Sequence, residues 1–556
     1  MKQNNIIRML LAGTFVMTIV SCNNDKLIES GEGQNKTART EVISVRTESE
    51  ATKVSVIGTS FSWNDGDKIA VWAGTNATSG SFQECTITGG ETSVDLGAGE
   101  DRYNYAVYPA SVKDASNYGQ STLNVVLPST YTYAEVSSEK TPLPMIAVNS
   151  KDQSKLTFYN VAGLFRIQVK AIPADATGLV LQFAGKKVNG TFAVSNPGTN
   201  APTISNASPA VNEDKITITF SAGTATDMIL NIPLPTGDYE EVFITPVGSS
   251  TKVGAFRFIS AGGYTAQRAH GKRMIATLVS FTLNGKQILF SPGNLRAKTT
   301  DLGANWTWSF AQHQYDYVGN ASANIAINGV MAVSANGTVD LFGWNGSSSE
   351  NNSYGINNST KCNINSGSDY GTSVSDVLKN DWGTLPIVNG GGITWRTPTY
   401  ADWSQCVPSN SSSARYALYG YAKVCNRGGI ILLPDNFVDP KTNTSTNANN
   451  TDGSLIPRSI VNSDFNTNIY TSDAWDAMEA AGAIFLPAAG QRSGNKVYMN
   501  DSGYDAGFYW SSTSYSQITS TGAIYSMGMY MRANGNTGTG QGPRNSGKSV
   551  RLIHEL

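Results

Sequence analysis

Residues that could do catalytic chemistry are few and scattered along this chain. The three histidines are His270, His313 and His554, and His313 lies near Asp316 and Asp340. His313 would suit a general base and the two aspartates a glycosidase pair, but none is near a recognisable nucleophile. We interpret all three as structural, because they lie among aromatic residues, turns and strand ends. No Gly-x-Ser-x-Gly, His-Glu-x-x-His or phosphate-loop motif occurs. The sequence therefore predicts a protein that is not an enzyme, with no cofactor and no metal site.

One cysteine does have the surroundings of a modification site. The run Ile19-Val20-Ser21-Cys22 follows an apolar stretch and two early basic residues, as in a bacterial lipoprotein signal. The implied chemistry is acylation of the Cys22 thiol and cleavage just before it; the alternative is an ordinary signal peptide with a chance cysteine. Of the other cysteines, Cys406 and Cys425 would either pair in an exported protein or stay free thiols.

Composition limits the function further. The chain has 556 residues, which at about 150 residues per domain suggests three or four domains. Only 15% of the residues are charged and the formal net charge is −2. Binding to nucleic acid through neutralised phosphates needs a basic excess, so we expect no nucleic-acid partner.

The elements divide the chain in two. Up to about residue 278 the apolar residues alternate with polar ones, as in 165–169 and 216–220, which is typical of half-buried strands. After residue 279 come eight of the ten tryptophans and three helical patterns. Ser373 precedes apolar residues at helical spacing up to Trp382, Thr399 and Asp402 form a capping box, and Ser472 would cap a helix that ends before Gly482. We interpret most of the tryptophans as core residues rather than sugar-stacking platforms.

Five segments of the first half together resemble the fimbrillins, pilus subunits of oral and gut anaerobes. They are WNDGDKI (63–69), YAVYP (105–109), LPMIA (143–147), LTFYNVAGL (156–164) and IPLPTGDY (232–239). The resemblance implies two transthyretin-like β-sandwiches, export as a lipoprotein and cleavage after an arginine, which removes an N-terminal strand and opens a groove for a neighbour's strand. Arg46 is the first candidate for that cleavage and Arg39 the second; the alternative for each is an ordinary linker arginine.

The second half is similar to a module of surface proteins with a C-type lectin-like fold. The segments that carry this similarity are FSPGNL (290–295), WSFAQHQYDY (308–317), DLFGW (340–344), WRTPT (395–399), ILLPDN (431–436), FLPAAGQR (485–492), YWSST (509–513) and SVRL (549–552). The calcium and sugar motifs of such lectins are replaced here by Leu433-Pro434-Asp435-Asn436 and by Ser511-Ser512 after Trp510. We therefore expect no calcium site, and leave the ligand residues unknown.

These observations give a mostly β chain: a signal peptide (1–21), a linker or pro-segment (22–50), two β-sandwiches (51–160 and 161–278) and an α+β lectin-like module (279–556). The expected function is that of a pilus subunit at the tip, because a stalk subunit must donate a strand and this chain ends in a folded module. The expected partners are other pilus subunits, a surface glycan or protein ligand, and the outer membrane before maturation. The alternative is a permanently lipid-anchored, glycan-binding surface protein or a pilus anchor.

Overall fold

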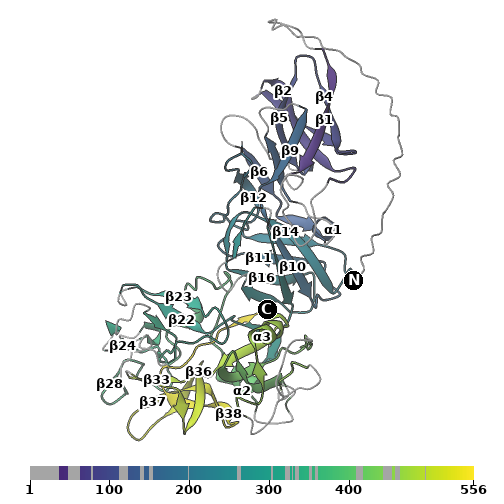
Figure 1. The fold of residues 1–556 in the computed structure, drawn as a ribbon. Coiled ribbons are helices and arrows are strands. Elements are labelled where there is room, and N and C mark those ends of the chain that lie inside the picture. Colours follow the sequence, from purple (N-terminus) through teal and green to yellow (C-terminus); the bar gives the residue numbers. More distant parts are fainter. Residues whose placement is uncertain are drawn as a thin grey trace, which may run out of the picture.

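A computed structural model describes most of the chain from residue 37 onward. The described residues are 37–47, 63–76, 79–111, 123–137, 143–148, 154–197, 199–258, 264–268, 270–301, 305–319, 326–327, 330–331, 337–349, 353–356, 361–408, 413, 418–441, 454–457, 464–494 and 496–556. The predicted signal peptide and Cys22 lie outside them. Three β-rich units follow one another in space, and the C-terminus lies at the junction of the second and third (Figure 1). The prediction of a mostly β chain is confirmed.

The N-terminal unit is one seven-stranded sheet in the order β3-β2-β5-β8-β9-β1-β4. All seven strands contribute side chains to a single core, which we call the first core, so the sheet curls around it. A ribbon of β6 (Asn124–Leu127) and β12 (Gly190–Ala193) covers the other face of β2, β5 and β8. The seven strands are β1 (Arg39–Thr47), β2 (Lys68–Asn76), β3 (Ser79–Thr86), β4 (Glu91–Leu96), β5 (Asp101–Tyr108), β8 (Met145–Val148) and β9 (Lys155–Asn160).

The middle unit has two sheets that face each other across one core. The predicted alternation is confirmed, since Phe165, Ile167 and Ile216 are all fully buried there. The small sheet contains β14 (Asp227–Leu234), β10 (Gly163–Lys170) and β19 (Gly271–Thr277). The large sheet contains β17 (Ala255–Phe258), β16 (Glu241–Val247), β11 (Gly178–Gln182), β13 (Lys215–Thr219) and β7 (Thr130–Thr132), and β15 (Gly237–Tyr239) pairs with β18 (Tyr264–Ala266) beside them.

The first two units exchange segments, so no single boundary at residue 160 separates their cores. β7 and helix α1 (Tyr133–Val136), from the range predicted for the first sandwich, place Tyr131 and Val136 in the middle core. In return, β12 from the second range places Phe192 on the N-terminal sheet. Each core therefore needs residues from both ranges. The transthyretin-like type of these units stays a prediction.

The C-terminal unit combines small sheets with two short α-helices, α2 (Tyr400–Cys406) and α3 (Ser472–Ala480). Its sheets are β20-β21-β39, β23-β22-β26, β31-β29-β30-β32 and β35-β36-β37-β38, with the pairs β24-β25, β27-β28 and β33-β34. Their bounds are β20 (Phe281–Leu283), β21 (Lys286–Phe290), β22 (Leu295–Lys298), β23 (Thr307–Phe310), β24 (Ala326–Ile327), β25 (Val330–Met331), β26 (Thr338–Val339), β27 (Cys362–Asn363), β28 (Gly367–Ser368), β29 (Tyr419–Val424), β30 (Arg427–Leu432), β31 (Ile469–Tyr470), β32 (Ile484–Pro487), β33 (Gln491–Ser493), β34 (Lys496–Tyr498), β35 (Asn500–Asp501), β36 (Tyr504–Ile518), β37 (Ile524–Arg532), β38 (Thr537–Pro543) and β39 (Ile553–Glu555). Two 3₁₀ turns, η4 (Ser353–Gly355) and η5 (Trp382–Thr384), complete it.

The helix predictions had mixed outcomes. α2 begins after Thr399, the N-cap of the predicted capping box, in which Asp402 N–H donates to Thr399 Oγ1 and the Asp402 carboxylate accepts from Thr399 N–H. α3 is also present, but Thr471 rather than Ser472 is its N-cap. The helix predicted from Ser373 to Trp382 is wrong. Asp376 there accepts bonds from Ser373 N–H and from the buried Arg544 guanidinium, which holds the segment in a loop.

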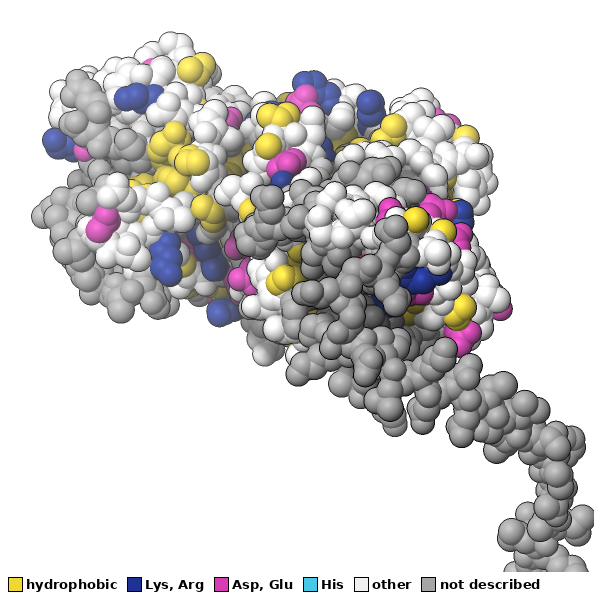
Figure 2. Space-filling model, turned by 90° about the horizontal axis from the view of Figure 1, so that it is seen from above, with side chains coloured by type: hydrophobic (Ala, Val, Ile, Leu, Met, Phe, Trp, Pro, Cys, Tyr) yellow, Lys and Arg dark blue, Asp and Glu magenta, His cyan; other side chains and the backbone are white. Residues whose placement is uncertain are grey.

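Charge is spread thinly over the surface. Lys and Arg side chains are interspersed with Asp and Glu on the face seen in Figure 2, without a broad field of one sign. On this face the distribution agrees with the formal net charge of −2. Among the described residues, no helix has the length and apolar character that a membrane crossing requires.

Candidate functional site

Strand β1 is the first candidate site, because both predicted cleavage residues lie in it. Residues Arg39 to Ser44 pair antiparallel with β4, and residues Ser44 to Thr47 pair in parallel with β9. Within the segment predicted as a linker or pro-segment (22–50), residues 39–47 form an inner strand of the N-terminal sheet, and the pro-segment role stays a prediction. β1 forms a strand because β4 and β9, which come much later in the chain, supply the hydrogen-bond partners of its backbone.

The two faces of β1 have opposite environments. Ile43 and Val45 are 1% and 2% exposed and belong to the first core. Val42, which precedes Ile43 in the strand, points outward from the opposite face and is 63% exposed. The core side of β1 meets Val94 of β4 and Phe158 of β9. Burying a side chain such as Ile or Val contributes about 1.5–3 kcal/mol, so this face holds the strand in place.

The two arginines differ in their attachment. Arg39 Nη2 lies 2.8 Å from Glu41 Oε1 and 3.0 Å from Asp101 Oδ1, and its Nη1 donates to the Glu100 carbonyl. The hydrogen bond to Glu41 is the main cause that raises the pKa of Arg39. Arg46 is exposed and lies one residue before the end of β1. A cut after Arg39 would leave residues 40–47 attached to the chain, whereas a cut after Arg46 would free almost the whole strand.

The last residues of the chain form a second feature that bears on assembly. β39 pairs with β21, and Val550, Leu552 and Ile553 are fully buried. Arg551 is also buried, and its Nη2 donates to Gln314 Oε1 at 2.7 Å. Residues 550–553 are thus part of the C-terminal unit's core and could leave it only if that core opened.

The other predicted residues take structural places. His313 stacks on Tyr315 with ring centroids 4.9 Å apart. The Asp316 carboxylate accepts from His313 N–H, and the buried Asp340 carboxylate accepts from Val318 N–H at 2.6 Å. In the C-terminal unit, seven of the eight tryptophans are buried, which confirms their interpretation as core residues: Trp308, Trp344, Trp382, Trp395, Trp403, Trp475 and Trp510.

The cysteines and the loop that contains Asp435 also have structural roles. Cys85, Cys362, Cys406 and Cys425 are free thiols, so the pair that the sequence left open for Cys406 and Cys425 is not formed. The Asp435 carboxylate accepts from Thr282 N–H at 2.7 Å, which ties its loop to β20. The described part of the chain contains no group of three His, Cys, Asp or Glu placed to hold a metal ion.

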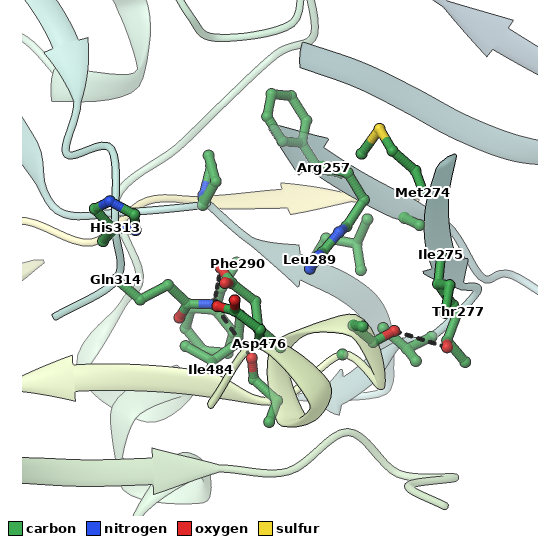
Figure 3. Close-up of a pocket in the computed structure, with 18 of the residues that line it drawn as sticks. Arg257, Met274, Ile275, Thr277, Leu289, Phe290, His313, Gln314, Asp476 and Ile484 are labelled. Atoms are coloured by element: carbon green, nitrogen blue, oxygen red, sulfur yellow. Dashed lines mark hydrogen bonds between the residues drawn. The ribbon is translucent and has the colours of Figure 1, made fainter. Parts of the chain in front are cut away.

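The structure adds a site that the sequence analysis did not find. A cavity of about 610 Å³ lies between the middle and C-terminal units, where Arg257 and Asp476 enter it from opposite sides (Figure 3). Burial, followed by the nearby Glu479, raises the pKa of Asp476. Arg257 appears in the sequence only as the polar residue between Phe256 and Phe258, a pattern typical of any half-buried strand.

Comparisons with known proteins gave distant structural likenesses alone. No protein-family profile and no curated protein sequence matches the chain. A solved putative cell adhesion protein from Bacteroides ovatus is 13% identical, with 44% of this chain and 93% of that one covered at a TM-score of 0.29. The tip fimbrial protein Mfa3 from Porphyromonas gingivalis, with a C-terminal truncation, is 11% identical over 45% of this chain and 85% of that one, with a TM-score of 0.18. A fimbrial protein from Bacteroides ovatus is 11% identical over 94% of this chain and all of that one, with a TM-score of 0.19. With such scores these likenesses carry no argument by themselves.

Proposed function

We propose that this chain is a fimbrial subunit with an adhesive role, which matures by cleavage after Arg46 and then accepts a strand from a neighbouring subunit. The observation that carries the proposal is the position of β1, an inner strand that ends one residue after an exposed arginine. The sequence resemblance to fimbrillins implies the same sequence of events. We propose export as a lipoprotein acylated at Cys22, and so a start on the outer membrane.

Loss of residues up to Arg46 would create a site for a strand. β4 would lose all six residue pairs that join it to β1, and β9 would keep only the pair between Thr47 and Phe158. Both strands would then present unpaired N–H and C=O groups beside an open core at Val94 and Phe158. A strand from another subunit with apolar residues at alternate positions would satisfy both needs, which is β-strand addition.

The burial of residues 550–553 bears on the position of the subunit in a fibre. Residues 550–553 are built into the core of the C-terminal unit, so a strand donated from them would cost that core Val550, Leu552 and Ile553. We propose a tip position, in which these residues stay in their core and the C-terminal unit faces outward. The lectin-like type of this unit stays part of the proposal.

One observation favours the alternative, a surface protein that keeps its lipid anchor. β1 is paired with β4 along its first six residues and with β9 along its last four, and a protease needs an extended, unpaired segment to cut. If β1 rarely opens in the cell, the chain would stay joined to acylated Cys22 as an anchor or a glycan receptor.

The N-terminus of the protein taken from the cell surface separates these functions. We expect a start at Thr47 and loss of the acylated piece. The Arg46→Ala variant should keep Cys22 and fail to enter fibres, while Arg39→Ala should mature normally. An acylated Cys22 on the wild-type surface protein would overturn the proposed maturation and favour the anchored alternative.

A further inference from the structure

The cavity between the middle and C-terminal units has the size and position of a small-molecule site. Its volume of about 610 Å³ lies within the range of about 300–1,000 Å³ that is usual for ligand pockets, which form preferentially between domains. β17 and β19 form one wall, and β21 and α3 form the other. A hydrogen bond of 2.8 Å from Thr277 Oγ1 to the Ala480 carbonyl joins these walls (Figure 3).

Arg257 has one donor, its Nε, that no described residue uses. Its Nε is buried and has no hydrogen-bond partner, although the side chain reaches toward the cavity from β17 (Figure 3). A buried polar group without a partner lowers the stability of the folded protein. A ligand oxygen would satisfy this donor once the guanidinium shifts toward the cavity, and would then remove part of that cost.

Asp476 provides the matching acceptors on the other side. Its side chain is exposed to the cavity from α3, and neither of its oxygens accepts a hydrogen bond from the described residues. Glu479, one turn further on the helix, is held by Gln314, whose Nε2 donates to Glu479 Oε1 at 3.0 Å. Asp476 is therefore the carboxylate that remains available to a ligand.

The charges that line the cavity balance. Arg257 and Arg273 are opposed by Asp476 and Glu479, so an anion would meet two carboxylates and a cation two guanidinium groups. A hydroxyl both accepts and donates, and can serve Arg257 and Asp476 together. Apolar residues, Leu289 and Phe290 among them, also line the cavity, and an apolar surface suits the C–H face of a sugar ring.

We propose that this cavity binds a neutral saccharide unit, with Arg257 donating to and Asp476 accepting from its hydroxyl groups. The cavity is made by both units, so a bound sugar would also fix the C-terminal unit against the middle one. The inference deepens the adhesive part of the proposed function, since it names a ligand class. It does not depend on cleavage or on strand acceptance.

Charge-matched sugars test the proposal on the purified full chain. Glucose, glucuronate and glucosamine share one ring and differ in charge, and galactose, mannose and N-acetylglucosamine extend the neutral set. We expect ligand-observed NMR titrations to show binding of at least one neutral sugar. Tighter binding of glucuronate or glucosamine than of every neutral sugar, or no binding of any neutral sugar, would overturn the proposal.

Two variants and a matched control locate the site. We expect Asp476→Asn and Arg257→Met to weaken binding of the neutral sugar at least tenfold. Asp473→Asn changes an exposed carboxylate on the same helix that does not line the cavity, and should leave binding unchanged. Thermal unfolding of each variant reports its folding. Equal affinity in all three variants would place the sugar elsewhere, while the maturation proposal would keep its own separate test.

Discussion

Substitutions on the buried face of β1 should weaken its attachment to the first core, and the size of this effect can be estimated. After a cut behind Arg46, the freed strand is held by its hydrogen bonds and by Ile43 and Val45, which are 1% and 2% exposed. Changing a buried Ile to Ala costs about 2–5 kcal/mol and the smaller Val somewhat less, so Ile43→Ala with Val45→Ala should cost at least about 3 kcal/mol. Because about 1.4 kcal/mol is a factor of ten, the double variant should release the strand roughly 100-fold more readily.

Limited trypsin digestion followed by size-exclusion chromatography measures this release. The amount of the fragment ending at Arg46 that stays with the folded chain is determined by mass spectrometry over time. Val42→Ala is the matched control on the same strand, because Val42 is 63% exposed and should change the release by less than about 0.5 kcal/mol. Equal retention in the double variant and the wild type would refute the view that the first core holds β1.

Three further predictions concern stability and can be measured by urea unfolding. Asp376→Ala breaks the 2.9 Å ion pair with the fully buried Arg544 and should lower the free energy of unfolding by about 3–5 kcal/mol. The neighbouring Val377 is 66% exposed, so Val377→Ala is the control and should change stability little. A small loss in Asp376→Ala would contradict the structural role of the pair. Burial and, second, the charge of Glu240 raise the pKa of Glu241 to about 8. The folded state therefore binds the Glu241 proton more tightly than the unfolded state does, and the stability of the wild type falls as the pH rises from about 5 to 8. Glu241→Gln should remove this fall, so that at pH 8 its free energy of unfolding exceeds that of the wild type by up to several kcal/mol, relative to the difference at pH 5. If stability changes with pH in the same way in both proteins, the Glu241 carboxyl is not buried in solution. Thr399→Ala removes the cap of α2 and should cost about 1 kcal/mol, with no loss if the capping box does not form.

Local patterns predicted what local physics decides. The strands around Phe165 and Ile216 follow from alternation, because a residue's neighbours two positions away share its face of the sheet. The capping box of Thr399 and Asp402 follows from a hydrogen bond across three residues. The burial of most tryptophans in the C-terminal unit follows from their size, since so large an apolar surface is costly in water.

The predictions that depend on distant partners failed or could not be made. The pattern of Ile43 and Val45 is short, and β1 becomes a strand only because β4 and β9 lie on either side of it. The helix after Ser373 does not form because Arg544, 168 residues from Asp376, needs that carboxylate inside the core.

The assembly groove and the cavity show the same division between sequence and tertiary structure. The place of Arg46 near the start of the first β pattern can be read from the sequence, whereas the groove that a cut there would open depends on the pairing of β1 with β4 and β9. The alternation of Arg257 with Phe256 and Phe258 can likewise be read from the sequence. That Asp476 lies across the cavity from Arg257 depends on the packing of α3 against β19. Side chains that meet only when elements over 200 residues apart come together are fixed by the packing of whole units, and no local pattern contains that information.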